Sequence, residues 1–494
     1  MSRIIKYARA TIKTAGPVIV GGRGFHRLAD ISTSFDGERL VITMSALKGV
    51  LKDALNFYAT EDLVKKATGS VPDDEPQVFE ESKVLFQDFS CDIYELDIRT
   101  RIKVERMTRT AESGGLFTAA TIPIGTTFEG NIFFKEGLSD DEITKIIEIL
   151  NNHKHKIGAS KTAGFGSIEF RVDEPEEVEV RRLPPGFYKV YFKPLTPFVS
   201  TKYGNQTLEK RYLLESQPQI SGDAMKSVLN VERATFFYPT DIKSSDIESL
   251  VNPKYYYSYK YEENSKENLL FDLLKARFNK QAFLLEKSGK RLERAKGTKV
   301  KRVYNFHIKR NFMVNTVETF WVQQAYKPEY IVGYVYSSSE LEIPEFISIG
   351  GARGKGYGLM KFDSKEEIAD EPEVIENYIE KFNRKLSKYV DIGDEKYVPL
   401  LILTPTIVKN TDELFKTIKP VFEFCDIQNF RYYNQQTSKT HIVKAISPGS
   451  FILFKIIDSE NCISEILEKR KTGLGELTEK GCGAFEIIET NKWG

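Results

Sequence analysis

The sequence predicts an α+β protein built from three ferredoxin-like β-α-β-β-α-β units in tandem, the middle one degraded and carrying a long insertion. Three observations support this prediction. A pattern of apolar strand, helix, glycine-rich loop and short strand occurs three times along the chain. Each occurrence is preceded by a β-rich segment that ends near a proline. Charged stretches without periodicity separate the repeats.

The first occurrence, residues 126–170, shows the pattern most completely. An apolar strand precedes a helix whose start is marked by Ser139 and Glu142, spaced as in a capping box. Apolar residues then recur at helical spacing, which predicts one buried helix face. The glycine-rich loop Gly158–Gly166, called loop one, and the strand Ser167–Phe170 complete the pattern.

The last occurrence repeats this order. The strand Phe451–Ile456 leads through a helix to loop three, Gly473–Gly483, and then to the strand Ala484–Ile488. The middle occurrence is degraded, because only a short segment joins the strand Tyr330–Tyr336 to loop two, Gly350–Gly358.

The β-rich segments that open the units also resemble one another. In the second, Tyr188, Val190 and Phe192 alternate with other residues, which is the period of a half-exposed strand. We expect its other face, with Lys189 and Tyr191, to be exposed, basic and aromatic. In the first unit an apolar helical pattern follows and completes the ferredoxin-like order. The prolines are Pro17 in the first segment, Pro194 and Pro197 in the second, and Pro405 in the third.

The boundaries follow from the repeats. Residues 173–186 and 366–376 are charged and aperiodic, which predicts linkers. An insertion is expected at about residues 202–319, with a tyrosine cluster at 255–259 and a basic run at 287–310. The expected domains are unit one at residues 1–178, unit two at 186–365 and unit three at 390–494.

The overall charge is close to balance. Lys and Arg total 71 against 70 Asp and Glu, a formal net charge of +1. Bulk positive charge is therefore excluded as a means of holding nucleic acid, and a polyanion site requires segregated charge. The basic run at 287–310, with Glu293 as its single acid, is one such segregated segment.

Neither a membrane segment nor a cofactor is expected. No stretch approaches the ~18 apolar residues of a membrane helix, and the N-terminus lacks the apolar run of a signal peptide. The four cysteines are far apart without a CxxC pair. His153 and His155 have no nearby Cys or Asp to complete a zinc site. We therefore expect a cytoplasmic protein with reduced thiols and no metal.

The glycine-rich loops are candidates for phosphate contact, because glycine exposes backbone N–H groups without a β-carbon. Basic residues recur in loop one (Lys161) and loop two (Arg353 and Lys355), which favours phosphate contact there over a purely tight turn. In loop three, Glu476 and Glu479 outweigh the single lysine and predict a structural role. Neither basic loop has the spacing of a Walker or dinucleotide motif.

The segment at residues 21–37 gathers glycines, two arginines, a histidine and two carboxylates. One hypothesis is RNA cleavage, with Asp30 or His26 as general acid or base. The alternative makes Asp36 and Gly37 a turn, Asp30 a solvated or capping acid, and His26 a backbone contact.

The order of these motifs resembles the RAMP superfamily of CRISPR-associated proteins. An opening strand leads to Gly21 and Gly22, and the first helix opens with Ser45-Ala-Leu-Lys48-Gly49. Loop one then follows the second helix. This resemblance implies RRM-like folds.

The C-terminal half is similar to one RAMP type in particular. Ala445–Phe451 followed by loop three resembles the tail of the Csx-type, Cas-five-like subunit of type III-D effector complexes, and Ile349–Gly358 resembles its central loop. The resemblance implies a non-catalytic subunit that binds the guide RNA (crRNA) and holds or caps its 5′ tag in antiviral defence. It also implies RAMP backbone proteins and large and small subunits as partners, with target RNA as a further candidate.

Two alternatives remain. Backbone RAMP subunits cut target RNA with an aspartate in the first loop, and Asp30 lies in the corresponding region, so an endoribonuclease using Asp30 or His26 is one. A purely structural subunit that docks a neighbour through residues 255–259 is the other. Phe25, Tyr191 and Tyr357 are candidates for base stacking. The candidate RNA-binding residues are Gly22, Arg23, His26, Arg27, Ser45, Lys48, Lys52, Ser160, Lys161, Thr162, Arg353 and Lys355.

Overall fold

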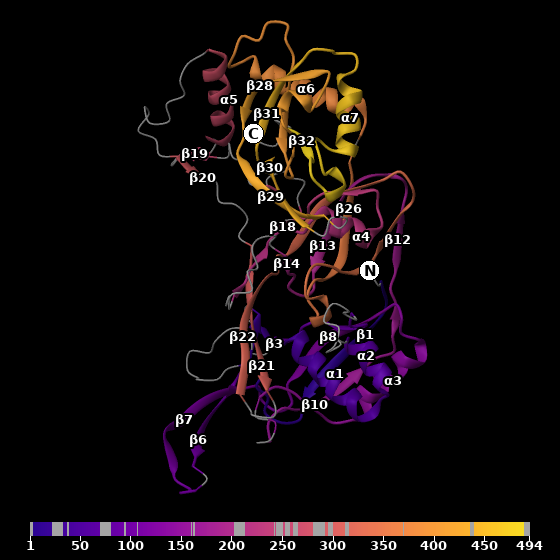
Figure 1. Cartoon of the computed structure of the whole chain (residues 1–494), viewed down its shortest axis with the longest axis vertical. Helices are drawn as coiled ribbons and strands as arrows, with labels where there is room; N and C mark the ends of the chain where they lie inside the picture. Colours follow the sequence, from indigo (N-terminus) through magenta and orange to yellow (C-terminus); the bar gives the residue numbers. More distant parts are fainter. Residues whose placement is uncertain are drawn as a thin grey trace.

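Three α+β units follow one another along the long axis of the molecule, from unit one at the bottom of Figure 1 to unit three at the top. Their sheets are antiparallel and have the strand order of ferredoxin-like folds, so the predicted fold class is confirmed. The computed structural model describes residues 3–21, 33–36, 39–69, 81–92, 95–105, 107–159, 161, 164–201, 213–241, 243, 250–251, 257–259, 265–279, 292–294, 300–311, 316–368, 370–434 and 439–488.

Unit one places its fourth, first, third and second core strands side by side, with two helices packed on one face. The second helix starts at the predicted capping box, where Ser139 accepts the Glu142 N–H and the Glu142 carboxylate accepts the Ser139 N–H. The core strands are β10 (Ser167–Val172), β1 (Ile4–Thr14), β8 (Thr127–Lys135) and β5 (Phe89–Cys91), and the helices are α1 (Met44–Tyr58) and α3 (Asp140–Asn152).

Shorter strands extend this sheet, and unit one also contains a short helix. One hairpin projects from the unit at the lower left of Figure 1. The additional elements are β2 (Phe35–Asp36), β3 (Arg39–Ile42), α2 (Glu61–Thr68), β4 (Val84–Phe86), β9 (His155–Lys156) and β11 (Glu176–Glu177). The hairpin consists of β6 (Asp97–Val104) and β7 (Ala111–Thr121).

Unit two has the same strand order, but its described residues 338–358, between the third and fourth core strands, contain no α-helix, as the degraded pattern predicts. Strands β24 (Leu341–Pro344) and β25 (Phe346–Ser348) occupy the connection between its third and fourth core strands. Its core elements are β13 (Gly186–Pro194), α4 (Gly222–Leu229), β17 (Arg233–Ala234), β18 (Tyr238–Thr240), β23 (Tyr330–Ser337) and β26 (Leu359–Glu367). The span 202–319, expected to be an insertion, thus contains α4, β17 and β18, which belong to the core because both strands pair with β23.

The linker expected at residues 173–186 also contains structure, since β12 (Val180–Leu183) pairs with β24. The remainder of the insertion reaches both neighbouring units. Helix α5 (Ser265–Phe278) lies beside unit three, where Phe271 stacks on Phe382. The other elements are β14 (Ser200–Thr201), β15 (Leu213–Leu214), β16 (Ser216–Gln217), β19 (Tyr257–Tyr259), β20 (Leu292–Arg294), β21 (Arg302–Asn311) and β22 (Thr316–Tyr326).

The hairpin β21–β22 reaches towards unit one (Figure 1), and lysines at its base bind Asp36 of β2. Lys327 donates to Asp36 at 2.7 Å, and Lys301 also donates to it. Burial alone would raise the pKa of Asp36, but the two lysines hold it well below its usual range. Asp36 is the last residue of β2 and pairs with Arg39 of β3, so it stands where the hypothesis of a turn at Asp36 and Gly37 places it, and it also joins two units. Gly37 lies outside the described residues.

Unit three has the same strand order, but a helix from before the unit takes the place of its first helix. Residues 403–417, all of which the structure describes, contain only the short 3-10 helix η4 (Thr411–Glu413). Helix α6 (Pro372–Leu386), which precedes the unit, packs Ile375 and Ile379 into the same core instead. It starts within the linker expected at 366–376. The remaining elements are β27 (Tyr397–Ile402), β28 (Ile418–Phe424), β29 (Ile427–Asn434), β30 (Lys439–Ile446), β31 (Phe451–Ile456), α7 (Cys462–Thr472) and β32 (Phe485–Ile487).

The prediction of a half-exposed first strand in unit two is wrong. Lys189 is 2% exposed and Tyr191 is 0% exposed. Helix α4 covers the face that carries Tyr188 and Val190, while α5 and unit three cover the opposite face, where Tyr191 packs. Strand β13 is therefore buried on both sides, which alternation along one strand does not reveal.

The three glycine-rich loops share one backbone framework that links each loop to the opening segment of its unit. A loop N–H donates to the carbonyl of the residue two positions after the proline, and the last glycine N–H donates to the proline carbonyl itself. The opening segment and the glycine-rich loop of each unit thus form one hydrogen-bonded motif, which recurs in all three units. The pairs are Ala159–Ile19 and Gly166–Pro17 in unit one, Gly351–Val199 and Gly358–Pro197 in unit two, and Glu476–Ile407 and Gly483–Pro405 in unit three.

Candidate nucleic-acid interface

Helix α1 presents three of the candidate RNA-binding residues on its solvent side. The Asp88 carboxylate accepts the Met44 N–H at 2.9 Å and so caps the helix start. Ser45 is exposed in the first turn, with its hydroxyl 3.2 Å from that of Thr43. Lys48 and Lys52 are four residues apart and therefore lie on one side of the helix.

Loop two of unit two lies directly against this helix. Lys48 donates to the carbonyl of Gly354, although the two residues are 306 positions apart in the chain. A β-carbon at Gly356 would lie 2.5 Å from Cγ of Met44, so glycine is required for this contact. Tyr357 is buried in the core of unit one. The structure therefore brings the loop two cations, Arg353 and Lys355, to the start of α1.

Five cations gather where these elements meet, and we call this group the basic junction. Burial, and then repulsion from Lys52, Lys355 and Lys135, together lower the pKa of Lys48 to about 8. Burial also lowers the pKa of Lys355. The members of the basic junction are Lys48, Lys52, Lys135, Arg353 and Lys355.

One carboxylate partly balances the basic junction. Glu81 accepts from Lys135 at 2.8 Å and lies 3.4 Å from Arg353. Burial lowers the pKa of Lys135, although Glu81 acts in the opposite direction. Lys52, Lys355 and Lys135 nevertheless repel Lys48, and an anion placed there would relieve that repulsion. Phosphate oxygens accept hydrogen bonds from lysine and arginine, which makes the site suited to a nucleic-acid backbone.

Loop one meets the same helix farther along. Lys161 donates to the carboxylate of Asp53, one residue after Lys52, at 3.3 Å. Both partners are largely exposed, so the pair contributes little to stability. Asp53 played no part in the sequence prediction. Helix α1 is thus flanked by both basic loops.

The structure describes only some of the predicted site residues. Gly22, Arg23, His26, Arg27, Asp30, Ser160 and Thr162, together with Phe25, lie outside the described residues. Of those described, Lys48, Lys52, Arg353 and Lys355 meet in the basic junction, while Ser45 and Lys161 lie nearby on or beside α1. Tyr191 and Tyr357 are 0% and 1% exposed, so their prediction as stacking residues is wrong.

Loop three packs against unit two in a different chemical setting. The guanidinium of Arg233 donates to the carbonyls of Arg470, Lys471 and Cys482 at 2.8–3.2 Å. Burial lowers the pKa of Arg233 to about 10. Its charge faces the carbonyl end of α7, which is the negative end of the helix dipole. These contacts are those of a structural loop.

The histidines considered for zinc have structural contacts. His153 stacks on Tyr58 with ring centroids 3.7 Å apart, and the buried His155 places Nε2 3.0 Å from the Leu150 carbonyl. Burial lowers the pKa of His155. Within the described part of the chain, no group of three or more His, Cys, Asp or Glu side chains could hold a metal ion. No helix of that part is long and apolar enough to cross a membrane.

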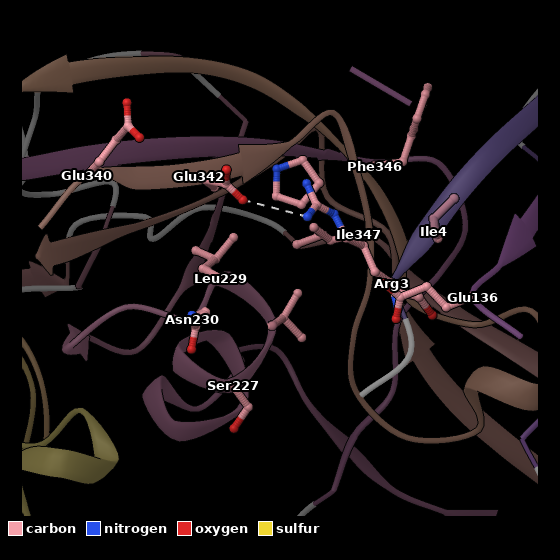
Figure 2. A pocket seen from close by; sticks show the side chains of 13 residues that line it. Arg3, Ile4, Glu136, Ser227, Leu229, Asn230, Glu340, Glu342, Phe346 and Ile347 are labelled. Carbon is pink, nitrogen blue, oxygen red and sulfur yellow. Dashed lines mark hydrogen bonds and ion pairs between the residues drawn. The ribbon is translucent and has the colours of Figure 1, made fainter. Parts of the chain in front are cut away.

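A pocket between units one and two has the opposite charge (Figure 2). Glu136, Glu340 and Glu342 line it together with Arg3. Arg3 is 3.7 Å from the Glu342 carboxylate, and its backbone N–H donates to Glu136 at 3.3 Å. Carboxylates outnumber guanidinium groups here, so the pocket would repel a phosphate backbone.

The sequence reasoning missed the hairpins. Each unit inserts one between its second and third core strands, namely β6–β7, β21–β22 and β29–β30. In unit one, Ile98 and Ile102 are exposed, and Arg101 lies 4.5 Å from the ring centroid of Phe165 in loop one. The alternation of isoleucine with arginine and threonine from Ile98 to Ile102 is the signal that could have revealed the first hairpin.

Comparison with known proteins agrees with the resemblance inferred from the motifs. Residues 11–169, which include α1 and loop one, match the family model described as the RAMP superfamily. The resemblance is thereby confirmed at superfamily level over unit one. No curated protein sequence matches the chain.

Two solved structures illustrate how limited the overall similarity is. One is a chain from the type III-B Cmr-beta complex in its apo state, with 15% identity and a TM-score of 0.28, covering 34% of this chain and 97% of that one. The other is from the same complex bound to cognate target RNA, with 15% identity, a TM-score of 0.28, and coverage of 34% and 96%.

Proposed function

We propose that this protein is a guide-RNA-binding subunit of a type III CRISPR ribonucleoprotein, in the Cas-five-like role of holding the 5′ tag. The observation that carries the proposal is the basic junction, where Lys48 and Lys52 of α1 meet Arg353 and Lys355 of loop two. The RAMP match of unit one supports the class of protein. The order of motifs in the C-terminal half supports the subunit type and its role in antiviral defence.

The chemistry of the junction favours contact with the RNA backbone. Its side chains are cations, and the aromatic residues near it, such as Tyr357, are buried in protein cores. Phosphate contacts are independent of base identity, so they fit a subunit that holds a fixed tag by its backbone. Such contacts also make binding to a single strand strongly dependent on salt.

The first experiment identifies the bound nucleic acid. The tagged protein is purified from its host and the RNA that accompanies it is sequenced. We expect RNAs that share a repeat-derived 5′ segment. Bound RNAs without a common 5′ segment would contradict the 5′-tag role, and preparations without RNA would contradict guide binding.

The second experiment tests the basic junction itself. In the triple variant Lys48→Ala, Lys52→Ala, Lys355→Ala, affinity for a synthetic guide RNA should fall about tenfold or more, because three phosphate contacts are lost. The slope of log affinity against log salt should fall by about 2. The matched control removes three exposed lysines of unit three, Lys388, Lys396 and Lys416, and so changes the net charge equally. Equal losses in both triple variants would contradict a specific site.

A further inference from the structure

Exposed aromatic side chains gather at the end of helix α1 that lies farther from the basic junction. Phe57 is 83% exposed and Tyr58 is 51% exposed. Their ring centroids are 6.3 Å apart, and Tyr58 stacks on His153 with ring planes only 6° from parallel. We call Phe57, Tyr58 and His153 the aromatic platform. Large aromatic side chains usually bury most of their surface, so a group of them in solvent indicates a binding surface.

Two helices of unit one hold the aromatic platform in place. Tyr58 is the last residue of α1, and His153 is the residue that ends α3. Both helices pack their apolar residues into the core of unit one, so the platform stands on a rigid base. Rings that are already ordered lose little conformational freedom when a flat ligand stacks on them, which favours binding.

Lysines border the aromatic platform. Phe57 stands one helical turn after Asp53, whose carboxylate accepts from Lys161 at 3.3 Å. Lys156 donates to the Lys161 carbonyl at 3.2 Å, and Lys154 directly follows the platform in the sequence. Lys154 and Lys156 are both exposed. Aromatic rings beside cations suit a single-stranded nucleic acid, because the rings stack on its bases and the cations attract its phosphates.

One side of helix α1 connects the aromatic platform to the basic junction. Lys48, Lys52 and the exposed Asn56 are spaced four residues apart, so they lie on one side of the helix, and Phe57 follows Asn56 directly. A rise of about 1.5 Å per residue separates Lys48 from Phe57 by about 13 Å along the helix axis. A strand whose phosphates bind at the basic junction can therefore follow α1 and reach the platform within a few nucleotides.

We infer that the aromatic platform stacks an unpaired base of the RNA strand whose backbone binds at the basic junction. This inference rests on the proposed function, because it adds a second contact to the same strand. Stacking tolerates every base, since each has a flat aromatic face. The platform thus fixes the position of one nucleotide along α1 without reading its identity. The stacking residues expected from the sequence, Tyr191 and Tyr357, are buried and cannot do this.

The first test separates stacking from charge. Phe57→Leu keeps an apolar side chain but removes the ring, so affinity for a synthetic guide RNA should fall about tenfold. The slope of log affinity against log salt should not change, because no phosphate contact is lost. Phe57→Tyr keeps a ring and should bind normally, as should the control Ile427→Ala, which alters a 70% exposed apolar side chain of unit three. Unchanged affinity in Phe57→Leu, or an equal loss in the control, would overturn the inference.

A fluorescent base locates the stacked nucleotide. The adenine analogue 2-aminopurine loses fluorescence when it stacks, so guide RNAs that carry it at successive single positions are titrated with the protein to saturation. The unmodified protein should quench one position that Phe57→Leu does not quench. Circular dichroism checks that the variant is folded, which its exposed position favours. The same quenching pattern in both proteins would contradict stacking on Phe57.

The rival occupant of the aromatic platform is another protein. Complexes purified from the host with Phe57→Leu should keep every subunit. Loss of a subunit, with unchanged RNA affinity of the isolated variant, would overturn the inference and assign the platform to a protein partner. The proposed function is judged separately, because the triple-lysine variant should lower the salt slope and, at saturating RNA, leave the quenched position unchanged.

Discussion

The two junctions between units have the same backbone construction, but the buried cation of each has different surroundings. At both, a glycine of a loop packs on the first residue of the preceding unit's first helix. Between units two and three, the buried cation Arg233 donates to three carbonyls. Between units one and two, Lys48 is surrounded by other cations, and its pKa falls to about 8 through burial and then their repulsion.

This difference distinguishes a junction whose cation contacts protein carbonyls from the junction that we propose binds RNA. Carbonyls at the end of α7 accept hydrogen bonds from the Arg233 guanidinium, so this cation has acceptors within the protein. In the basic junction, Glu81 pairs with Lys135 and Arg353, while Lys52, Lys355 and Lys135 repel Lys48. A bound polyanion would remove that repulsion, which couples the first junction to function.

The largest effect is expected from breaking the structural junction. Arg233→Met leaves three carbonyls without their donor in a buried site and should lower the free energy of unfolding by about 3 kcal/mol. Urea titration measures this loss. Arg384→Met, at an exposed position of α6, is the control and should change stability by less than about 0.5 kcal/mol. Equal stability of the two variants would show that the Arg233 contacts do not hold the units together.

The next largest effect is expected at the equivalent glycines of loop two, which packs on α1, and loop one. Gly356→Ala combines an unfavourable positive φ with a close contact to Met44, and should cost about 2–3 kcal/mol of unfolding free energy. Gly164→Ala has only the φ penalty and should cost about 1 kcal/mol. Thermal unfolding of the two isolated proteins gives the comparison. Similar costs would mean that loop two is not tightly docked.

A smaller effect concerns the ion pairs that tie the hairpin base to unit one. Asp36→Asn removes the charge that binds Lys301 and Lys327 and should cost about 1–2 kcal/mol at neutral pH. Because the folded pKa of Asp36 is held well below its usual range, this stabilisation is present above about pH 4 and is lost as the pH falls further. Unfolding measured at pH 7 and pH 3 should therefore show a smaller difference from the unmodified protein at pH 3 than at pH 7.

The smallest effect is on the pH dependence of RNA binding. Below pH 8, Lys48 is protonated in the free and bound states, so affinity is constant. Above pH 8, the free protein loses this charge while a bound phosphate retains it, so affinity should fall about tenfold by pH 9. Lys48→Arg keeps its proton and should remove this part of the pH dependence. The same fall in Lys48→Arg would assign the titration to another group.

The lysine also affects stability, with the opposite sign from a paired lysine. Its folded pKa of about 8 lies below the value of 10.5 for an unperturbed lysine. The unfolded chain therefore binds more protons between these values, and the Lys48 contribution to stability should rise with pH across that window. In Lys48→Met this rise should be absent from urea unfolding curves measured at pH 7.5 and pH 9.5.

Much of the fold could be predicted because its signals are local. The capping box at Ser139 and Glu142 and the degraded middle repeat are present in short stretches of sequence. The prolines and glycines that define each loop are also local, and they meet through short hydrogen bonds between Gly166 and Pro17 and their equivalents. The units were therefore recognisable before their positions in space were known.

The interface was only partly predictable. The residue types at Lys48 and Lys355 indicated phosphate contact separately, but nothing in the sequence paired a helix of unit one with a loop of unit two. Tyr191 was expected to be exposed, and it is buried because a second layer of structure covers its face. The turn expected at Asp36 gave no sign that its carboxylate binds Lys301 and Lys327, which are 265 and 291 positions away.

The sequence by itself determined the unit order, the helix start at Ser139 and the recurrence of the glycine-rich loops, because periodicity, capping and glycine or proline geometry act over a few residues. Only the tertiary structure decided which loops dock, which faces are buried and where positive charge accumulates. These properties depend on distances between residues far apart in the chain, as between Lys48 and Gly354. The near-neutral composition therefore hides a concentrated cationic site, because charge acts through spatial proximity.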